Sequence, residues 1–170
     1  MKIILGFILS LVSTISVAHI SAYPRVGVAD AYALITFNVP HSCYGSATKS
    51  VRITQPIAGL NMRPAAKANW DISVVQKDSP VGVYHSKNEF GEYYKTETDQ
   101  VTWTGILPEG FSEQFVINIK TPKDPQIIGF EVQQICEDGR IVNYTKDTQK
   151  STKEIIYETP VKFEVKKKTE

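Results

Sequence analysis

The sequence has almost no imbalance between basic and acidic side chains. Its 170 residues include 19 lysines and arginines against 18 aspartates and glutamates, and one of the lysines, Lys2, belongs to an N-terminal leader. Without that leader the side chains carry no net charge, and we interpret the tail Lys166–Lys168 as a solvated end. Proteins that bind phosphate backbones need clustered lysine and arginine, so the sequence excludes nucleic acid as a partner.

The short motifs of enzymes are missing as well. The chain contains no G-x-S-x-G elbow, no H-E-x-x-H pair and no glycine-rich phosphate loop, which are motifs that carry catalytic chemistry. Its carboxylates are scattered, and its histidines are limited to His19, His41 and His85. The sequence therefore predicts a protein that is not an enzyme.

Cysteine is scarce, because only Cys43 and Cys136 are present. In an exported protein an even pair predicts first a single disulfide, which stabilises the fold by restricting the unfolded chain. The alternative is a copper site with thiolate ligands, although the two cysteines share no short ligand spacing. The residues by themselves leave both interpretations open.

Long apolar runs are limited to one segment, Ile3–Val17, which follows a lysine at the start of the chain. A cation, an apolar run and small residues such as Ser16 and Ala18 just before a junction are typical of a secretory signal peptide. We expect residues 1–18 to be removed during export to the periplasm, which leaves one domain spanning 19–170. No later segment is long enough to cross a membrane, so no stable membrane insertion is expected after cleavage.

Cleavage after Ala18 would give His19 a property that internal residues lack. An N-terminal histidine carries a free α-amine and an imidazole, and the two groups can close a chelate ring on one metal. Nitrogen donors in a tetragonal arrangement suit Cu(II) best among the common biological metals. His19 is therefore a candidate Cu(II) ligand; the alternative is that cleavage exposes a histidine without a metal role.

The rest of the chain is built from short alternating segments. Ile35, Phe37 and Val39 alternate with more polar neighbours, which is the period of a strand with one buried face. The pair Asp138-Gly139 between two extended runs is typical of a hairpin turn. No segment has a helical period, and the spacing predicts an all-β fold, an antiparallel β-sandwich. The expected strands are 30–39, 48–55, 60–64, 70–75, 100–104, 113–120, 127–136, 140–144, 155–157 and 161–165.

Residues 77–99 interrupt this pattern with polar, mixed-charge sequence that includes several aromatic side chains. Their length predicts a long excursion or a loose hairpin, and long loops are often functional. The alternative function is therefore a non-metal β-sandwich that binds a protein or glycan through this aromatic loop, around Tyr84–Tyr94.

Several segments, taken in chain order, form a recognisable set. They are His19-Ile20, Val39-Pro40-His41-Ser42-Cys43-Tyr44-Gly45-Ser46-Ala47-Thr48, Asn69-Trp70, Val101-Thr102-Trp103-Thr104-Gly105, Leu107-Pro108, Glu113-Gln114-Phe115 and Gln134-Ile135-Cys136-Glu137-Asp138-Gly139. This set resembles the YcnI-like family of exported copper-binding domains. The closest match is the cysteine-containing Gram-negative branch, and the resemblance extends from His19 to about Tyr144.

The resemblance implies a β-sandwich of immunoglobulin or cupredoxin-like character that binds Cu(II). It implies a single-histidine brace, in which the mature α-amine and the imidazole bind together, and on this chain those ligands correspond to His19. It also implies a disulfide between Cys43 and Cys136. Members of the family are associated with copper trafficking alongside copper chaperones and copper-transporting membrane proteins, which are the partners we expect.

Several positions depart from the family pattern, among them Asn69, where members have glycine before the tryptophan, and the stretch after His19. Many members carry a tryptophan close to the copper after the hairpin, where this chain has Tyr144; such neighbours of the ligands can tune a metal site. Some members place a carboxylate just after the Val-Pro pair, where this chain has His41-Ser42. His41 is accordingly either a turn histidine with a satisfied hydrogen bond or a metal ligand brought near His19.

Overall fold

The structure is a computed structural model that describes residues 19–43, 45–80, 87, 89–92, 95–147 and 149–168. The proposed signal peptide, residues 1–18, lies outside these ranges, as do Tyr84, His85, Tyr93 and Tyr94 of the aromatic loop. Every regular element within the described ranges is a β-strand, which confirms the predicted all-β class. No helix that could span a membrane occurs in this part of the chain.

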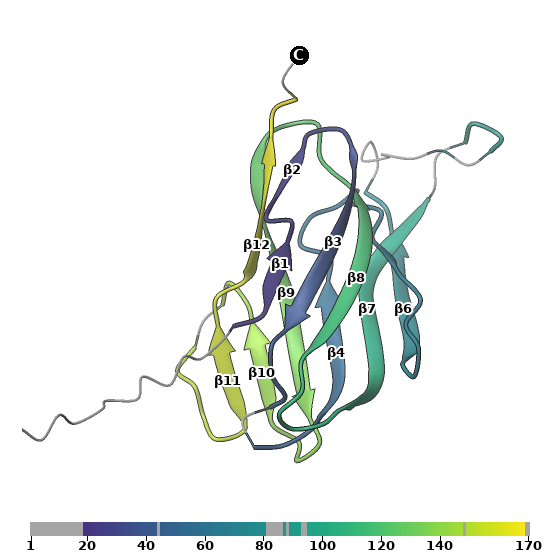
Figure 1. The fold of residues 1–170 in the computed structure, drawn as a ribbon. Coiled ribbons are helices and arrows are strands. Elements are labelled where there is room, and N and C mark those ends of the chain that lie inside the picture. The colour runs from purple at the N-terminus through teal and green to yellow at the C-terminus, as the bar shows by residue number, and fades with distance from the viewer. Residues whose placement is uncertain are drawn as a thin grey trace, which may run out of the picture.

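The strands are grouped into two sheets. In chain order they are β1 (Ser21–Tyr23), β2 (Val26–Val28), β3 (Tyr32–Val39), β4 (Thr48–Thr54), β5 (Arg63–Pro64), β6 (Asp71–Asp78), β7 (Thr96–Leu107), β8 (Glu113–Lys120), β9 (Gln126–Cys136), β10 (Ile141–Tyr144), β11 (Ile155–Glu158) and β12 (Val161–Lys166). The smaller sheet has the order β1-β3-β8-β5, and the larger sheet contains β11-β10-β9-β4-β7-β6. β12 joins the larger sheet through β9 and also pairs with β2. Figure 1 shows the two layers, with β3 and β8 in front of β4 and β9.

Alternation along the strands explains how the two sheets pack. Ile35 and Phe37 of β3 are fully buried and lie opposite Ile117 and Phe115 of β8. From the larger sheet, the Phe130 ring meets the Phe37 ring edge-on, with centroids 5.3 Å apart. Each fully buried side chain of this size contributes about 1.5–3 kcal/mol, so this shared apolar layer stabilises the predicted sandwich, which the structure confirms.

A disulfide joins Cys43, in the loop after β3, to Cys136 at the end of β9. Both cysteines are buried, and they are 93 residues apart in the sequence. Closing a loop of that length stabilises the folded state by up to about 4–5 kcal/mol in the chain-entropy model. The predicted bridge is confirmed, and the copper site with thiolate ligands is excluded because both sulfurs are bonded to each other.

The predicted excursion at 77–99 is longer than the one the structure contains. β6 continues to Asp78, β7 begins at Thr96, and these two residues are paired. This part of the pairing between β6 and β7 could not be predicted from the sequence, because its residues are mostly polar or charged. Lys77 and Asp99, for example, form an ion pair with Nζ and Oδ1 2.8 Å apart, and such residues give no apolar alternation to read.

Two strand pairs are parallel, in addition to the antiparallel pairs that the sequence predicted. β10 pairs with β11, and β2 pairs with β12. The segment 19–28 contains β1 and β2, and β2 pairs with the last strand, β12. The parallel pair β10–β11 matters for the site, because it sets two side chains beside His19.

Candidate metal centre

His19 lies two residues before β1, where the backbone is held by the fold. The N–H of Ile20 donates to the Tyr144 hydroxyl at 3.3 Å, and the side chains of Ile20 and Ala22 are buried. β1 then pairs with β3 in the smaller sheet. His19 is therefore attached to ordered β-structure.

Glu158, at the end of β11, contacts the His19 imidazole. Oε2 of Glu158 lies 2.9 Å from Nε2 of His19, and the two residues are 139 positions apart in the sequence. The His19 side chain is 51% exposed and that of Glu158 is 22% exposed. When Nε2 carries the ring proton it donates to this carboxylate, and Nδ1 then keeps its lone pair.

The Tyr144 ring lies beside the same imidazole. The residue is buried on β10, and its ring meets the His19 ring edge-on, with centroids 6.5 Å apart and planes at 82°. Tyr144 is also the residue paired with Glu158 across the parallel strands β10 and β11. One register therefore places both the aromatic ring and the carboxylate next to His19.

The His19 imidazole fits a metal ligand whose second nitrogen is already engaged. Metal-binding histidines usually donate their other ring N–H to a carboxylate or carbonyl, which fixes the ring and its tautomer. Glu158 supplies that carboxylate, and Nδ1 of His19 has no hydrogen-bond partner among the described residues. Nδ1 is also the ring nitrogen that can close a chelate ring with the α-amine of the same residue.

Side chains alone do not complete a metal site there. Within the described residues, no three His, Cys, Asp or Glu side chains come together in a way that could hold a metal ion. A metal at His19 would take its further donors from the α-amine and from groups outside this set.

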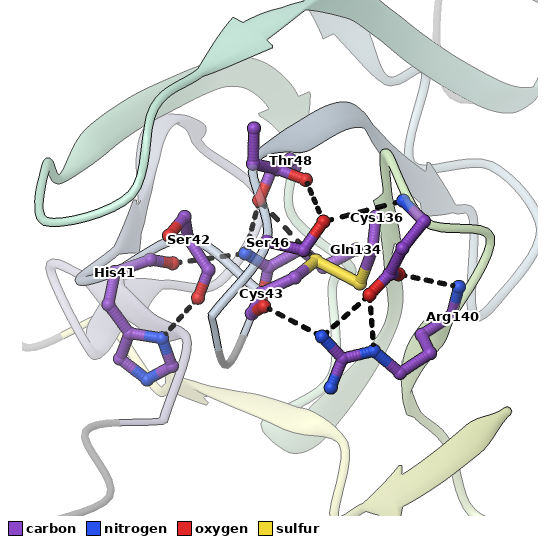
Figure 2. Close-up of a disulfide and its surroundings, with 10 residues drawn as sticks. His41, Ser42, Cys43, Ser46, Thr48, Gln134, Cys136 and Arg140 are labelled. Atoms are coloured by element: carbon purple, nitrogen blue, oxygen red, sulfur yellow. Dashed lines mark hydrogen bonds and ion pairs between the residues drawn. A yellow bond between two sulfur atoms is a disulfide. The ribbon is translucent and has the colours of Figure 1, made fainter. Parts of the chain in front are cut away.

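His41 lies in the loop that follows β3, close to the disulfide. Its Nδ1 is 2.6 Å from the Ser42 carbonyl oxygen, and its own carbonyl accepts from Nε2 of Gln134 at 3.0 Å. Figure 2 shows its ring pointing away from the disulfide. His41 does not join His19 and Glu158 in a group of three ligands, so its role as a ligand stays a prediction.

Polar contacts join the loop around Cys43 to β9 and to the connection between β9 and β10 (Figure 2). Gln134 donates from Nε2 to the Thr48 hydroxyl at 2.7 Å as well as to the His41 carbonyl. Asp138 accepts from the Arg140 backbone and guanidinium, which hold the pKa of its carboxyl below the usual range. These contacts give the loop a structural role.

A cavity of about 470 Å³ opens beside His19, between β1 and the turn that joins β11 to β12. Its lining includes the hydroxyl side chains of Ser21 and Thr159 and two basic side chains, Arg25 and Lys162. It is the feature of this region that sequence reasoning missed most completely. No motif marks Arg25, Lys162 or Glu158, because each lies in a different segment and only the fold gathers them.

The fold and the site define a β-sandwich domain with a candidate metal-binding histidine at its N-terminal edge. The chain belongs to the family described as "Domain of unknown function (DUF1775)", whose model matches residues 19–162. The YcnI-like domains belong to this family, so the predicted membership is confirmed at the family level.

A solved structure supports the fold assignment. The chain is similar to an uncharacterized protein from Nocardia farcinica whose crystal structure is described as revealing an immunoglobulin-like fold. The TM-score is 0.58 and the identity 22%, over 86% of this chain and 97% of that one. At that identity the likeness shows the fold alone, which is immunoglobulin-like as predicted. No curated protein matches this chain.

Proposed function

We propose that this protein is an exported Cu(II)-binding domain that stores copper or passes it on. The observation that carries the proposal is the pairing of His19 with Glu158, in which Nε2 lies 2.9 Å from a carboxylate oxygen. This contact engages one ring nitrogen and leaves Nδ1 to bind a metal together with the α-amine. The protein has no catalytic role in this proposal.

The chemistry follows from the two nitrogen donors of one residue. The α-amine must lose a proton before it coordinates, and its reference pKa is about 8. Copper binding should therefore release protons and weaken as the pH falls. The Tyr144 ring restricts the space on one side of the imidazole and so shields the metal from solvent on that side.

Three further observations support export and a mature end at His19. The leader has the composition of a signal peptide, and the family match begins at residue 19. The disulfide Cys43–Cys136 belongs to an oxidising compartment, for which the periplasm is our proposal. The partners would be a copper chaperone and a copper-transporting membrane protein.

The experiment is the intact mass of the exported protein, measured under native conditions with and without one equivalent of Cu(II). We expect a chain that begins at His19 and retains one copper. A different first residue, or a chain that begins at His19 and holds no copper, would overturn the proposal.

Two control chains separate the two nitrogen donors. The variant His19→Ala keeps the α-amine and removes the imidazole. A chain with a neutral linker ahead of His19 keeps the imidazole and removes the adjacent amine. Both should lose tight Cu(II) binding while keeping the circular dichroism of the parent, and retention of full affinity by either would contradict a chelate that uses both nitrogens.

A further inference from the structure

The cavity beside His19 has an unusual electrostatic character for a chain without net charge. Arg25, in the connection between β1 and β2, and Lys162, on β12, both line it, and both are exposed. Neither forms an ion pair with any residue in the described part of the chain. Two basic side chains therefore border one cavity without an acidic partner.

A third basic residue lies close to the same turn. A Cβ built at Gly129 would lie 3.3 Å from Cβ of Pro160 and 3.6 Å from Cε of Lys146, so the Lys146 side chain runs past the proline that lines the cavity. Lys146 also has no ion pair within the described ranges.

Two carboxylates that are close to the cavity-lining residues in the sequence have other contacts. Glu158 contacts His19, and Glu164, two residues after Lys162 on β12, has its Oε2 3.8 Å from Nζ of Lys166. No carboxylate of the described residues forms an ion pair with Arg25 or Lys162, so these two positive charges are not neutralised by direct contact with an acidic side chain. Clustered unpaired cations in a concave site attract anions, and an arginine fork with nearby hydroxyl donors suits a carboxylate.

We infer that the cavity bordered by Arg25 and Lys162 is a carboxylate-binding site beside the metal ligand His19. This inference rests on the proposed function, because the bound carboxylate would supply an oxygen donor at a place where no three His, Cys, Asp or Glu side chains of the described residues come together to hold a metal. Oxygen is an accepted donor for Cu(II) in a tetragonal N,O set. The carboxylate comes either from a small organic acid or from an acidic side chain of the protein that exchanges copper.

The first test uses the copper-free mature protein, labelled with ¹⁵N and titrated with malonate at constant ionic strength set by sodium chloride. We expect saturable amide shifts at Arg25, Thr159 and Lys162. The charge-removing pair Arg25→Gln and Lys162→Gln should weaken malonate binding about tenfold, a typical loss for a charge-assisted hydrogen bond. The matched control Lys123→Gln removes one exposed lysine from the β8–β9 connection and should leave binding unchanged.

The second test repeats the titration with one equivalent of Cu(II) and follows the electron paramagnetic resonance spectrum. Malonate should change the copper spectrum of the parent and of Lys123→Gln, and should change it far less in the Arg25→Gln/Lys162→Gln chain. Copper binding without any malonate effect, or an equal effect in the charge-removed chain, overturns this inference and leaves the proposed function intact. Malonate binding to a protein that holds no copper overturns the proposed function, and with it the donor role of the site.

Titrations with two further ligands, a peptide and phosphate, identify the chemistry of the bound anion and its source. An end-capped hexaglutamate peptide that binds more tightly than malonate at equal carboxylate concentration indicates a protein partner, whereas equal or weaker binding indicates a small organic acid. Phosphate binding as tight as malonate binding would overturn the assignment to carboxylates, because the cavity would then be a general anion site.

Discussion

The imidazole of His19 and the carboxylate of Glu158 are in contact at 2.9 Å although one stands at the start of the domain and the other on its penultimate strand. The contact exists because β10 and β11 run parallel and pair Tyr144 with Glu158. The same arrangement lets the Tyr144 hydroxyl accept from the backbone of Ile20. The geometry of the proposed copper ligand is therefore set by residues far from it in the sequence.

The substitution Glu158→Ala should lower Cu(II) affinity by roughly 10–100-fold, the usual cost of losing a carboxylate that orients a metal-binding histidine. Glu158→Gln should have a smaller effect, because the amide oxygen still accepts from Nε2. Competition with a chelating dye measures the affinity. Glu154→Ala, an exposed acidic residue just before β11, is the control and should bind as the parent does.

The substitution Tyr144→Phe keeps the ring beside His19 and removes the hydroxyl that accepts from Ile20. We expect the free energy of unfolding to fall by about 1 kcal/mol, the net value of a typical hydrogen bond. Tyr144→Ala should cost about 3–5 kcal/mol because it also leaves a cavity. Urea unfolding gives both values, and a Tyr144→Phe variant as stable as the parent would show that the hydroxyl contact carries no weight of its own.

Replacing both cysteines, Cys43→Ala with Cys136→Ala, should lower the free energy of unfolding by about 2–5 kcal/mol. Because neither sulfur is a metal ligand in this structure, the folded variant should still bind one Cu(II) with the affinity of the parent. Loss of copper from a variant that circular dichroism shows to be folded would contradict this separation of stability from binding.

The domain should lose stability in acid partly through Glu113. Burial raises the pKa of this carboxyl, but the Lys67 ammonium, 2.8 Å from Oε1, and the Gln114 backbone N–H outweigh burial and lower it. A lowered folded-state pKa means that the contribution is present above the unfolded pKa, near the ordinary glutamate value, and is lost as the pH falls through the folded value.

Thermal melts between pH 3 and pH 7 test this contribution, since Glu113→Gln should show a shallower loss of stability with acid than the parent. Glu109→Gln, an exposed residue in the turn before β8, should follow the parent. If Glu113→Gln lost stability with falling pH as steeply as the parent, the Glu113–Lys67 contact would not be a cause of the acid sensitivity.

Gly105, on β7, tests how closely the Trp70 indole packs against that strand. A Cβ at this position would lie 2.6 Å from Cδ2 and 2.8 Å from Cε3 of Trp70, so Gly105→Ala requires the indole to move. We expect a loss of about 1–3 kcal/mol, the usual cost of overpacking. Chemical unfolding measures it, and Thr104→Ala at the neighbouring exposed position should cost less.

In the hairpin between β9 and β10, the Asp-Gly signal predicted the position of the turn correctly but not its type. The pair Asp138-Gly139 marked the turn correctly, and Gly139 has a φ of 89°. Asp138 is not among the positive-φ residues, so the connection is not the two-residue turn in which both positions are left-handed. The longer loop forms because Cys136 N–H donates to the Arg140 carbonyl and Gly139 N–H donates back to Cys136.

The sequence by itself determined the strands whose signals are local. β3 and β8 were predictable because every second residue, such as Phe37 or Ile117, is apolar and buried. The disulfide was the first interpretation of two cysteines in a chain expected to be exported, and His19 was identifiable as a candidate ligand because a predicted signal-peptide junction precedes it. Each of these features depends on a few adjacent residues or on composition.

Only the tertiary structure decided what surrounds His19. Glu158, Arg25 and Lys162 are single charged residues in separate segments, and a charge on a strand has no period that identifies its partner. Their meeting depends on the sheet order and on the parallel pairs β10–β11 and β2–β12. Those pairings are fixed by how the whole apolar core packs, and that is a property no local stretch of this sequence contains.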